Sequence, residues 1–236
     1  MPPLELTGER TLPDVPEENY WFQRHLVVYR WVAERCAGLD VVDMACGEGY
    51  GTDLLAARAA RVTGVDANPQ AYEHARAKYT RPGVRFVREL VETYSEPCDA
   101  VVFLQTIEHL QDPGAVLTHF KQMAPTVYVS TPNVLTLAPE GAEKSGNPWH
   151  VREYRPQQFW DLCVQHFDHV ELWGVFHARK LRLHERAIRA GWDSLHPRLG
   201  ITTRFYDWFV PAISTEDFAI RRGDLDSALD FLAVLR

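Results

Sequence analysis

The chain has 236 residues, of which 46% are hydrophobic and 24% charged, and this ordinary globular composition excludes wholesale disorder. Its formal net charge of −7 disfavours non-specific binding of nucleic acid, so no nucleic-acid partner is expected. The four cysteines are spread without a C-x-x-C pair, and no apolar run approaches the ~20 residues that span a bilayer. We therefore expect no disulfide framework, no membrane partner and a cytoplasmic location.

Predicted strands and helices alternate along the chain. Apolar residues at helical spacing predict a first helix over 20–35, and short apolar runs after Gly38 predict strands separated by amphipathic helices. The segment 227–235 fits either a strand or a helix. This alternation predicts βαβ units and a Rossmann-like α/β fold with a doubly wound, mostly parallel sheet. The expected strands cover 41–44, 61–66, 84–87, 99–104, 126–130 and 169–175, and the expected helices cover 53–60, 69–79, 113–123 and 155–166.

The length favours a single domain over 1–236 with four parts. We expect an N-terminal lid segment over 1–37, a core over 38–176, an insertion over 177–210 near the site of the substrate, and a final core element over 211–236. Within the insertion, residues 177–204 carry seven Arg and Lys against two acidic residues. This stretch is either a solvated helical face or a lid over the substrate pocket.

Glycines follow the first predicted strand directly, at positions 47, 49 and 51. Such glycines let the backbone approach a ligand at the carboxyl end of a strand. Asp66 ends the second strand, where a carboxylate can accept two ribose hydroxyls. Asp43 would repel a pyrophosphate but suits a cationic ligand such as a sulfonium. The alternative is a structural glycine turn without a ligand.

The run D-M-A-C-G-E-G over residues 43–49 resembles motif I of the class I S-adenosylmethionine-dependent methyltransferases, D-x-G-x-G-x-G, with Ala45 in place of the first glycine. Residues 62–66 and 99–105 resemble motifs II and IV. The resemblance implies the methyltransferase fold and S-adenosylmethionine as cofactor, with the N-terminal helix either packed on the core or closing over the cofactor. The cofactor contacts implied are Asp43, Ala45, Gly47, Gly49, Asp66, Ala67, Glu89, Leu90, Gln105, Trp21 and His25.

Polar side chains also follow the fourth and fifth predicted strands. Gln105, Glu108 and His109 have the i, i+3, i+4 spacing of one helical face, and His150 lies on the loop after the fifth strand. Two imidazoles, a carboxylate and an amide carbonyl suit a divalent ion such as Mg²⁺. Alternatively, His150 acts alone as general base, or the set only shapes the turn.

This set resembles the E-x-x-E-H…H metal motif of ubiquinone-pathway O-methyltransferases and small-RNA 2′-O-methyltransferases, with Gln105 replacing the first Glu. It implies catalytic roles for Glu108, His109 and His150, with Gln105 as a fourth metal ligand. The segments 6–13, 18–29 and 147–153 resemble actinobacterial sugar O-methyltransferases of the methylmannose-polysaccharide type.

That resemblance implies a small sugar or oligosaccharide acceptor, namely a short mannoside in polymethylated polysaccharide biosynthesis, and a homodimer. The alternatives are O-methylation of another small molecule, such as an antibiotic, a glycoside or a phenol, and a non-catalytic protein that binds S-adenosylmethionine.

Overall fold

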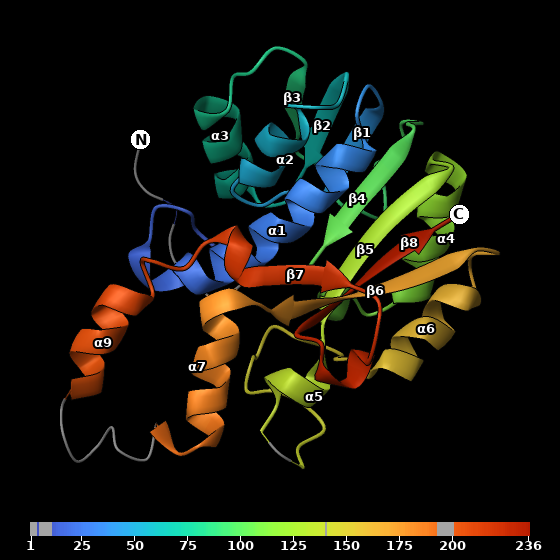
Figure 1. The fold of residues 1–236 in the computed structure, drawn as a ribbon. Helices are drawn as coiled ribbons and strands as arrows, with labels where there is room; N and C mark the ends of the chain where they lie inside the picture. The colour runs from blue at the N-terminus through green and yellow to red at the C-terminus, as the bar shows by residue number, and fades with distance from the viewer. Residues whose placement is uncertain (1–3, 5–10, 140, 193–200) are drawn as a thin grey trace.

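The computed structural model describes residues 4, 11–139, 141–192 and 201–236, and it is built on an eight-stranded sheet in the order β3-β2-β1-β4-β5-β8-β6-β7 (Figure 1). The first five strands are parallel. β8 lies antiparallel between β5 and β6, and β7 adds an antiparallel edge. The strands are β1 (Asp40–Met44), β2 (Arg61–Val65), β3 (Val84–Val87), β4 (Ala100–Leu104), β5 (Thr126–Pro132), β6 (Val170–His177), β7 (Phe218–Arg221) and β8 (Asp230–Leu235).

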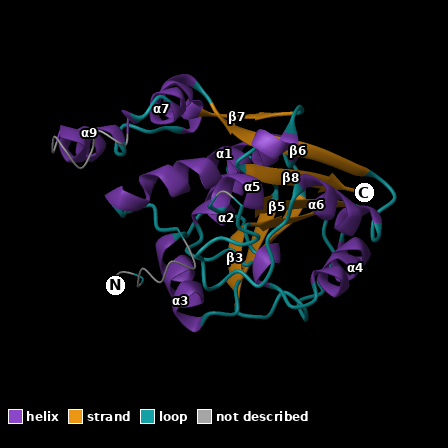
Figure 2. Cartoon of the chain, turned by 90° about the horizontal axis from the view of Figure 1, so that it is seen from below, coloured by secondary structure: helices purple, strands orange, loops and turns teal. Residues whose placement is uncertain are grey.

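Helices cover both faces of this sheet (Figure 2). One apolar cluster joins the sheet to α4 and α6 through Phe120 and Phe159, and a second joins it to α1 and α2 through Val32 and Leu55. β4 and β8 are buried along their whole length, as strands covered on both faces must be. The helices are α1 (Asn19–Arg35), α2 (Tyr50–Leu55), α3 (Pro69–Lys78), α4 (Pro113–Met123), α5 (Val134–Leu137), α6 (Pro156–Val164), α7 (Arg179–Arg189) and α9 (Ile201–Phe209).

The predicted α/β architecture is confirmed, and the differences from the predicted elements have local causes. The helix expected over 53–60 starts at Tyr50 and ends at Leu55, because Gly49 takes a left-handed φ of 98° and turns the glycine loop straight into the helix. The ambiguous C-terminal segment is strand β8, paired with both β5 and β6. β7 was not predicted because it is a short edge strand: it has only four residues, which pair with β6 alone and of which only one is buried.

The insertion contributes α7 and α9, which extend away from the sheet beyond β6 and β7 (Figure 1). His184 of α7 stacks on Phe205 of α9, with ring centroids 5.8 Å apart, so the two helices share a small aromatic core. Leu181 and Phe209 connect this core to the apolar cluster under α1. Within the described residues, no helix is both long and apolar enough to cross a membrane.

Candidate active site

A cavity of about 480 Å³ opens at the carboxyl ends of β1, β2 and β4. Ligands of doubly wound sheets bind there, because adjacent crossovers leave on opposite faces and open a crevice between β1 and β4. Of the cofactor contacts implied by the sequence, seven line this cavity: His25, Ala45, Gly47, Asp66, Ala67, Leu90 and Gln105.

The loop after β1 is shaped by left-handed residues at alternate positions, with φ of 56° at Ala45, 55° at Gly47 and 98° at Gly49. A Cβ at position 49 would lie 2.8 Å from the Cβ of Ala75, so only glycine fits there. Ala45 adopts the conformation despite its own Cβ, at a cost of about 1–2 kcal/mol. Gly49 therefore shapes the turn, while Ala45 and Gly47 face the cavity.

Asp66 and Asp43 take different places. The Asp66 carboxylate lines the cavity and accepts the backbone N–H groups of Gly47 and Asn68, each at 2.8 Å. Asp43 is fully buried beneath the loop, where it accepts hydrogen bonds from Thr52 Oγ1 at 2.6 Å and Tyr29 OH at 3.2 Å. Burial raises the pKa of Asp43 to about 7, although those hydrogen bonds lower it. Asp43 thus supports the loop from below.

At the far end of the cavity, Leu90 lies in the wall and Glu89 does not. Val91 and Glu92, which the sequence did not single out, complete this part of the wall. The chain after β3 runs without regular structure, so the face that each side chain presents could not be derived from strand or helix periodicity.

Glu48 is a buried carboxylate of the site that binds several side chains of α3 and its C-terminal end, and the sequence did not predict this role. Its carboxylate accepts hydrogen bonds from Tyr79 OH at 2.7 Å and from His74 Nε2 at 2.9 Å, and it pairs with Lys78 Nζ at 2.7 Å. Lys78 also pairs with Asp14, which ties the N-terminal segment to α3. The position of Glu48 between two motif glycines was the only sequence signal for this role, because the side chains that it binds lie 26 to 31 residues away.

A second cavity, of about 430 Å³, adjoins the first. Thr11, His25, Gln105 and His109 line both, so the two cavities lie side by side. The residues found only in the second cavity are Glu18, Trp21, Arg24, Glu108, Pro132, Leu137, Ser145, Gly146, Asn147 and His150. Trp21, expected at the cofactor, therefore lines the second cavity and not the first. No described residue of 177–210 lines either cavity, and a lid role of this insertion stays a prediction.

The structure brings Glu108, His109 and His150 together as the sequence predicted, with one ligand atom from each lying within 4.8 Å of the others. Glu108 and His109 belong to a 3-10 turn, Ile107–His109, that follows β4. The Glu108 carbonyl accepts the backbone N–H of Val151 at 2.8 Å, which docks the loop after β5 onto that turn. These backbone contacts hold His150 against the other two side chains.

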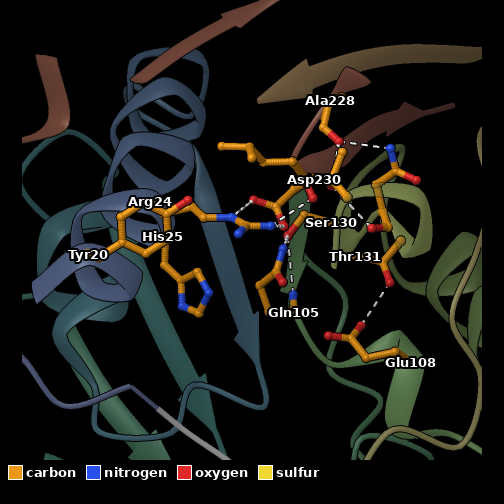
Figure 3. Close-up of polar contacts among 12 residues, drawn as sticks. Tyr20, Arg24, His25, Gln105, Glu108, Ser130, Thr131, Ala228 and Asp230 are labelled. Atoms are coloured by element: carbon orange, nitrogen blue, oxygen red, sulfur yellow. Dashed lines mark hydrogen bonds and ion pairs between the residues drawn. The ribbon is translucent and has the colours of Figure 1, made fainter. Parts of the chain in front are cut away.

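Glu108 is only 1% exposed, and Thr131 Oγ1 donates to its carboxylate at 3.0 Å (Figure 3). Burial raises the pKa of Glu108 to about 8. A bound cation would favour its ionised form. Gln105 lies where the cavities meet, at a left-handed φ of 52°, and its Nε2 donates to Ser130 Oγ at 3.0 Å.

The polar residues of α1 form the opposite wall (Figure 3). Arg24 is 4% exposed and donates from Nε and Nη2 to the carboxylate of Asp230, both at 2.6 Å. Burial lowers the pKa of His25 to about 4, so this imidazole is neutral at pH 7. Neither residue therefore offers the cofactor carboxylate an uncompensated positive charge, and a contact of His25 with the cofactor stays a prediction.

A family model described as a methyltransferase domain matches residues 20–185. A probable S-adenosylmethionine-dependent methyltransferase from Mycolicibacterium smegmatis is 38% identical and aligns over 98% of this chain and 94% of its own. The ubiquinone biosynthesis O-methyltransferase of Xylella fastidiosa is 29% identical over 45% of this chain and 49% of its own. A solved S-adenosylmethionine-dependent methyltransferase from Thermotoga maritima superposes with a TM-score of 0.61 at 16% identity, over 94% of this chain and 95% of its own. The chain belongs to the class I S-adenosylmethionine-dependent methyltransferases.

Proposed function

We propose that this methyltransferase transfers the methyl group to the oxygen of a sugar hydroxyl, with a short mannoside of polymethylated polysaccharide biosynthesis as acceptor. The observation that carries the proposal is the meeting of the two cavities at Gln105 and His109, beside the cluster of Glu108, His109 and His150. One cavity accommodates the donor and the other the acceptor, so the reacting atoms meet at their junction.

On the donor side, Asp66 offers its carboxylate to the ribose hydroxyls, held in place by two backbone N–H groups. Leu90 and Val91 provide apolar contact for the adenine. Asp43, which was expected to repel a pyrophosphate and suit a sulfonium, is buried beneath the loop, so the choice of a sulfonium nucleoside as ligand rests on the family and not on this carboxyl group.

On the acceptor side, the wall combines an aromatic surface with polar groups. Trp21 lines the cavity and is 38% exposed, so its ring can contact the apolar face of a sugar. Glu18, Ser145 and Asn147 supply polar atoms along the same wall for sugar hydroxyls. The segments 6–13, 18–29 and 147–153, which carry the resemblance to sugar O-methyltransferases, include Trp21, Glu18 and Asn147.

Glu108, His109 and His150 would hold the proposed divalent ion, Mg²⁺ or a similar one. The carboxylate suits Mg²⁺, and the two imidazoles suit a divalent transition ion better. Glu108 is a buried carboxylate whose proton such an ion would displace. When bound, the ion supplies Lewis-acid chemistry, which orients the acceptor hydroxyl and lowers its pKa. Without the ion, His150 would take the hydroxyl proton as general base, a role worth about 10²–10⁴-fold in rate.

In either case, the C–S bond to the methyl group breaks as the C–O bond forms. The sulfonium becomes a neutral thioether, and the hydroxyl proton leaves to a base. The ubiquinone biosynthesis O-methyltransferase relative supports an oxygen acceptor. Another small molecule with a hydroxyl group, such as a phenol or an antibiotic glycoside, would satisfy the same chemistry.

His150→Ala tests the assignment against a protein that only binds the cofactor. We expect the variant to bind S-adenosylmethionine as the wild type does in calorimetry, because His150 lines only the acceptor cavity. Transfer of a labelled methyl group to short mannosides should fall at least about 100-fold. Trp208→Ala is the control, since this exposed side chain on α9 lines neither cavity. Undiminished turnover in the His150 variant would contradict the active-site assignment.

A further inference from the structure

Glu153 lies immediately behind the acceptor cavity, and the proposed function gives it no role. Its side chain is 0% exposed, and its Oε1 lies 2.6 Å from His150 Nδ1. The backbone N–H of Ser145 donates to its Oε2 at 2.7 Å, and the Ser145 hydroxyl donates to its Oε1.

These contacts determine where the His150 proton lies. Both oxygens of Glu153 accept hydrogen bonds from Ser145, and Oε1 also lies within hydrogen-bond distance of His150 Nδ1. Asn147 Oδ1 accepts the backbone N–H of Trp149 at 3.0 Å, which turns Asn147 Nδ2 toward His150. That amide donates to His150 Nε2 at 3.0 Å, so Nε2 carries the lone pair. The ring is therefore the neutral Nδ1–H tautomer.

The loop that holds His150 also forms a hydrogen bond with Nδ1 of the second imidazole, His109. The carbonyl oxygen of Trp149 lies 2.9 Å from His109 Nδ1, and because a carbonyl can only accept, this nitrogen is also a donor. The two rings stand nearly perpendicular, at 78°, with centroids 5.1 Å apart. With both protons on Nδ1, both Nε2 atoms carry the lone pair that a metal ligand or a base requires.

We infer that Glu153 is a positioning residue, which fixes the tautomer and ring orientation of His150 so that its Nε2 carries the lone pair. In the structure this lone pair accepts the Asn147 amide, which a metal ion or an acceptor hydroxyl would displace. The functional role of this positioning rests on the proposed function, whereas the His150 tautomer depends only on contacts within this chain. Outer carboxylates that hold a ligating imidazole typically affect metal affinity by about 10–100-fold.

Imidazole ¹⁵N NMR of the metal-free protein tests the inference directly, with the His150 signals identified by their loss in His150→Gln. The wild type should show His150 protonated at Nδ1. Glu153→Ala should shift the ring toward protonation at Nε2, and Glu153→Gln, whose amide oxygen still accepts, should restore Nδ1–H. Calorimetry with Mn²⁺ as the probe should show an affinity loss of about 10–100-fold in Glu153→Ala and a smaller loss in Glu153→Gln.

Asp217→Ala is the matched control. Asp217 is also buried, and it accepts the backbone N–H and the hydroxyl of Ser214 much as Glu153 does for Ser145, but it lines neither cavity. This variant should leave the His150 tautomer and the Mn²⁺ affinity unchanged. If Glu153→Ala does not fold, Glu153→Gln decides, because its loss of charge must still weaken Mn²⁺ binding while Nδ1–H is kept.

A wild-type His150 protonated at Nε2 overturns the inference, as does a folded Glu153→Ala with an unchanged tautomer. Mn²⁺ affinity within twofold of wild type in every Glu153 variant also contradicts it. A wild type that shows the expected tautomer and its dependence on Glu153 but binds no Mn²⁺ would instead remove the ion from the proposed function and leave the positioning role of Glu153 in place.

Discussion

Replacing Asp43 by Asn should change how the stability of the cofactor-free protein depends on pH. The pKa of Asp43 is raised by burial from 3.8 to about 7, so the folded protein keeps this proton at pH values where the unfolded chain has lost it. Unfolding free energy therefore falls as pH rises toward 7 and levels off above it. Between pH 5 and pH 8, this loss amounts to about 3 kcal/mol. An asparagine side chain has no such proton to lose, so Asp43→Asn should gain about 3 kcal/mol relative to wild type across that range.

Urea unfolding at several pH values measures the difference between the two proteins, in which the contributions of all other groups cancel. Asp217→Asn is the control, because the pKa of Asp217 is lowered, chiefly by hydrogen bonds from Ser214 and Lys180 that outweigh its burial. Asp217 is thus ionised in both states throughout this range, and the control difference should not change with pH. A pH-independent difference for Asp43→Asn would refute the assignment of a neutral carboxyl group beneath the glycine loop.

Three further substitutions test the walls of the site. Arg24→Met should lower the unfolding free energy by about 3–5 kcal/mol, because it leaves the carboxylate of Asp230 buried without its partner. Gly51→Ala should cost about 1–3 kcal/mol in urea unfolding, since the new Cβ would lie 2.2 Å from the Tyr29 ring. Trp21→Ala should raise the KM for the acceptor about 2- to 10-fold in methyl-transfer kinetics and leave the KM for S-adenosylmethionine unchanged.

Each of these has a matched control. Arg61→Met breaks an exposed pair with Asp40 and should lower the unfolding free energy far less than Arg24→Met does. Gly146→Ala should be nearly neutral, because no atom lies within 4 Å of its added Cβ. Trp208→Ala should leave both KM values unchanged. Equal effects in a variant and its control would contradict the role given to the first residue of that pair.

The fold and the convergence of the site could be predicted because both follow from strand ends. Asp66 directly follows β2, which a short apolar run predicts, and Glu108 comes shortly after β4, which is buried throughout. The carboxyl ends of parallel strands share one edge of the sheet, which brings His150 from the next loop to Glu108 and His109.

Contacts that depend on the path of a loop could not be predicted in this way. The roles of Glu48 and Glu153 follow from partners whose positions require the folded loops, and neither residue lies on a periodic element. The choice between Glu89 and Leu90 at the cavity wall also depends on irregular backbone after β3. Asp43 was expected to contact the cofactor, but its place on a fully covered strand buries it instead.

Transfer of a labelled methyl group from S-adenosylmethionine to a panel of short, partly methylated α-mannosides tests the central claim most directly, with the assay run in parallel with EDTA and after addition of Mg²⁺. The account predicts labelled mannoside, loss of transfer with EDTA and its return with Mg²⁺. Transfer that resists EDTA would leave His150 as the sole base. No transfer to any mannoside by protein that still binds the cofactor would contradict the sugar assignment.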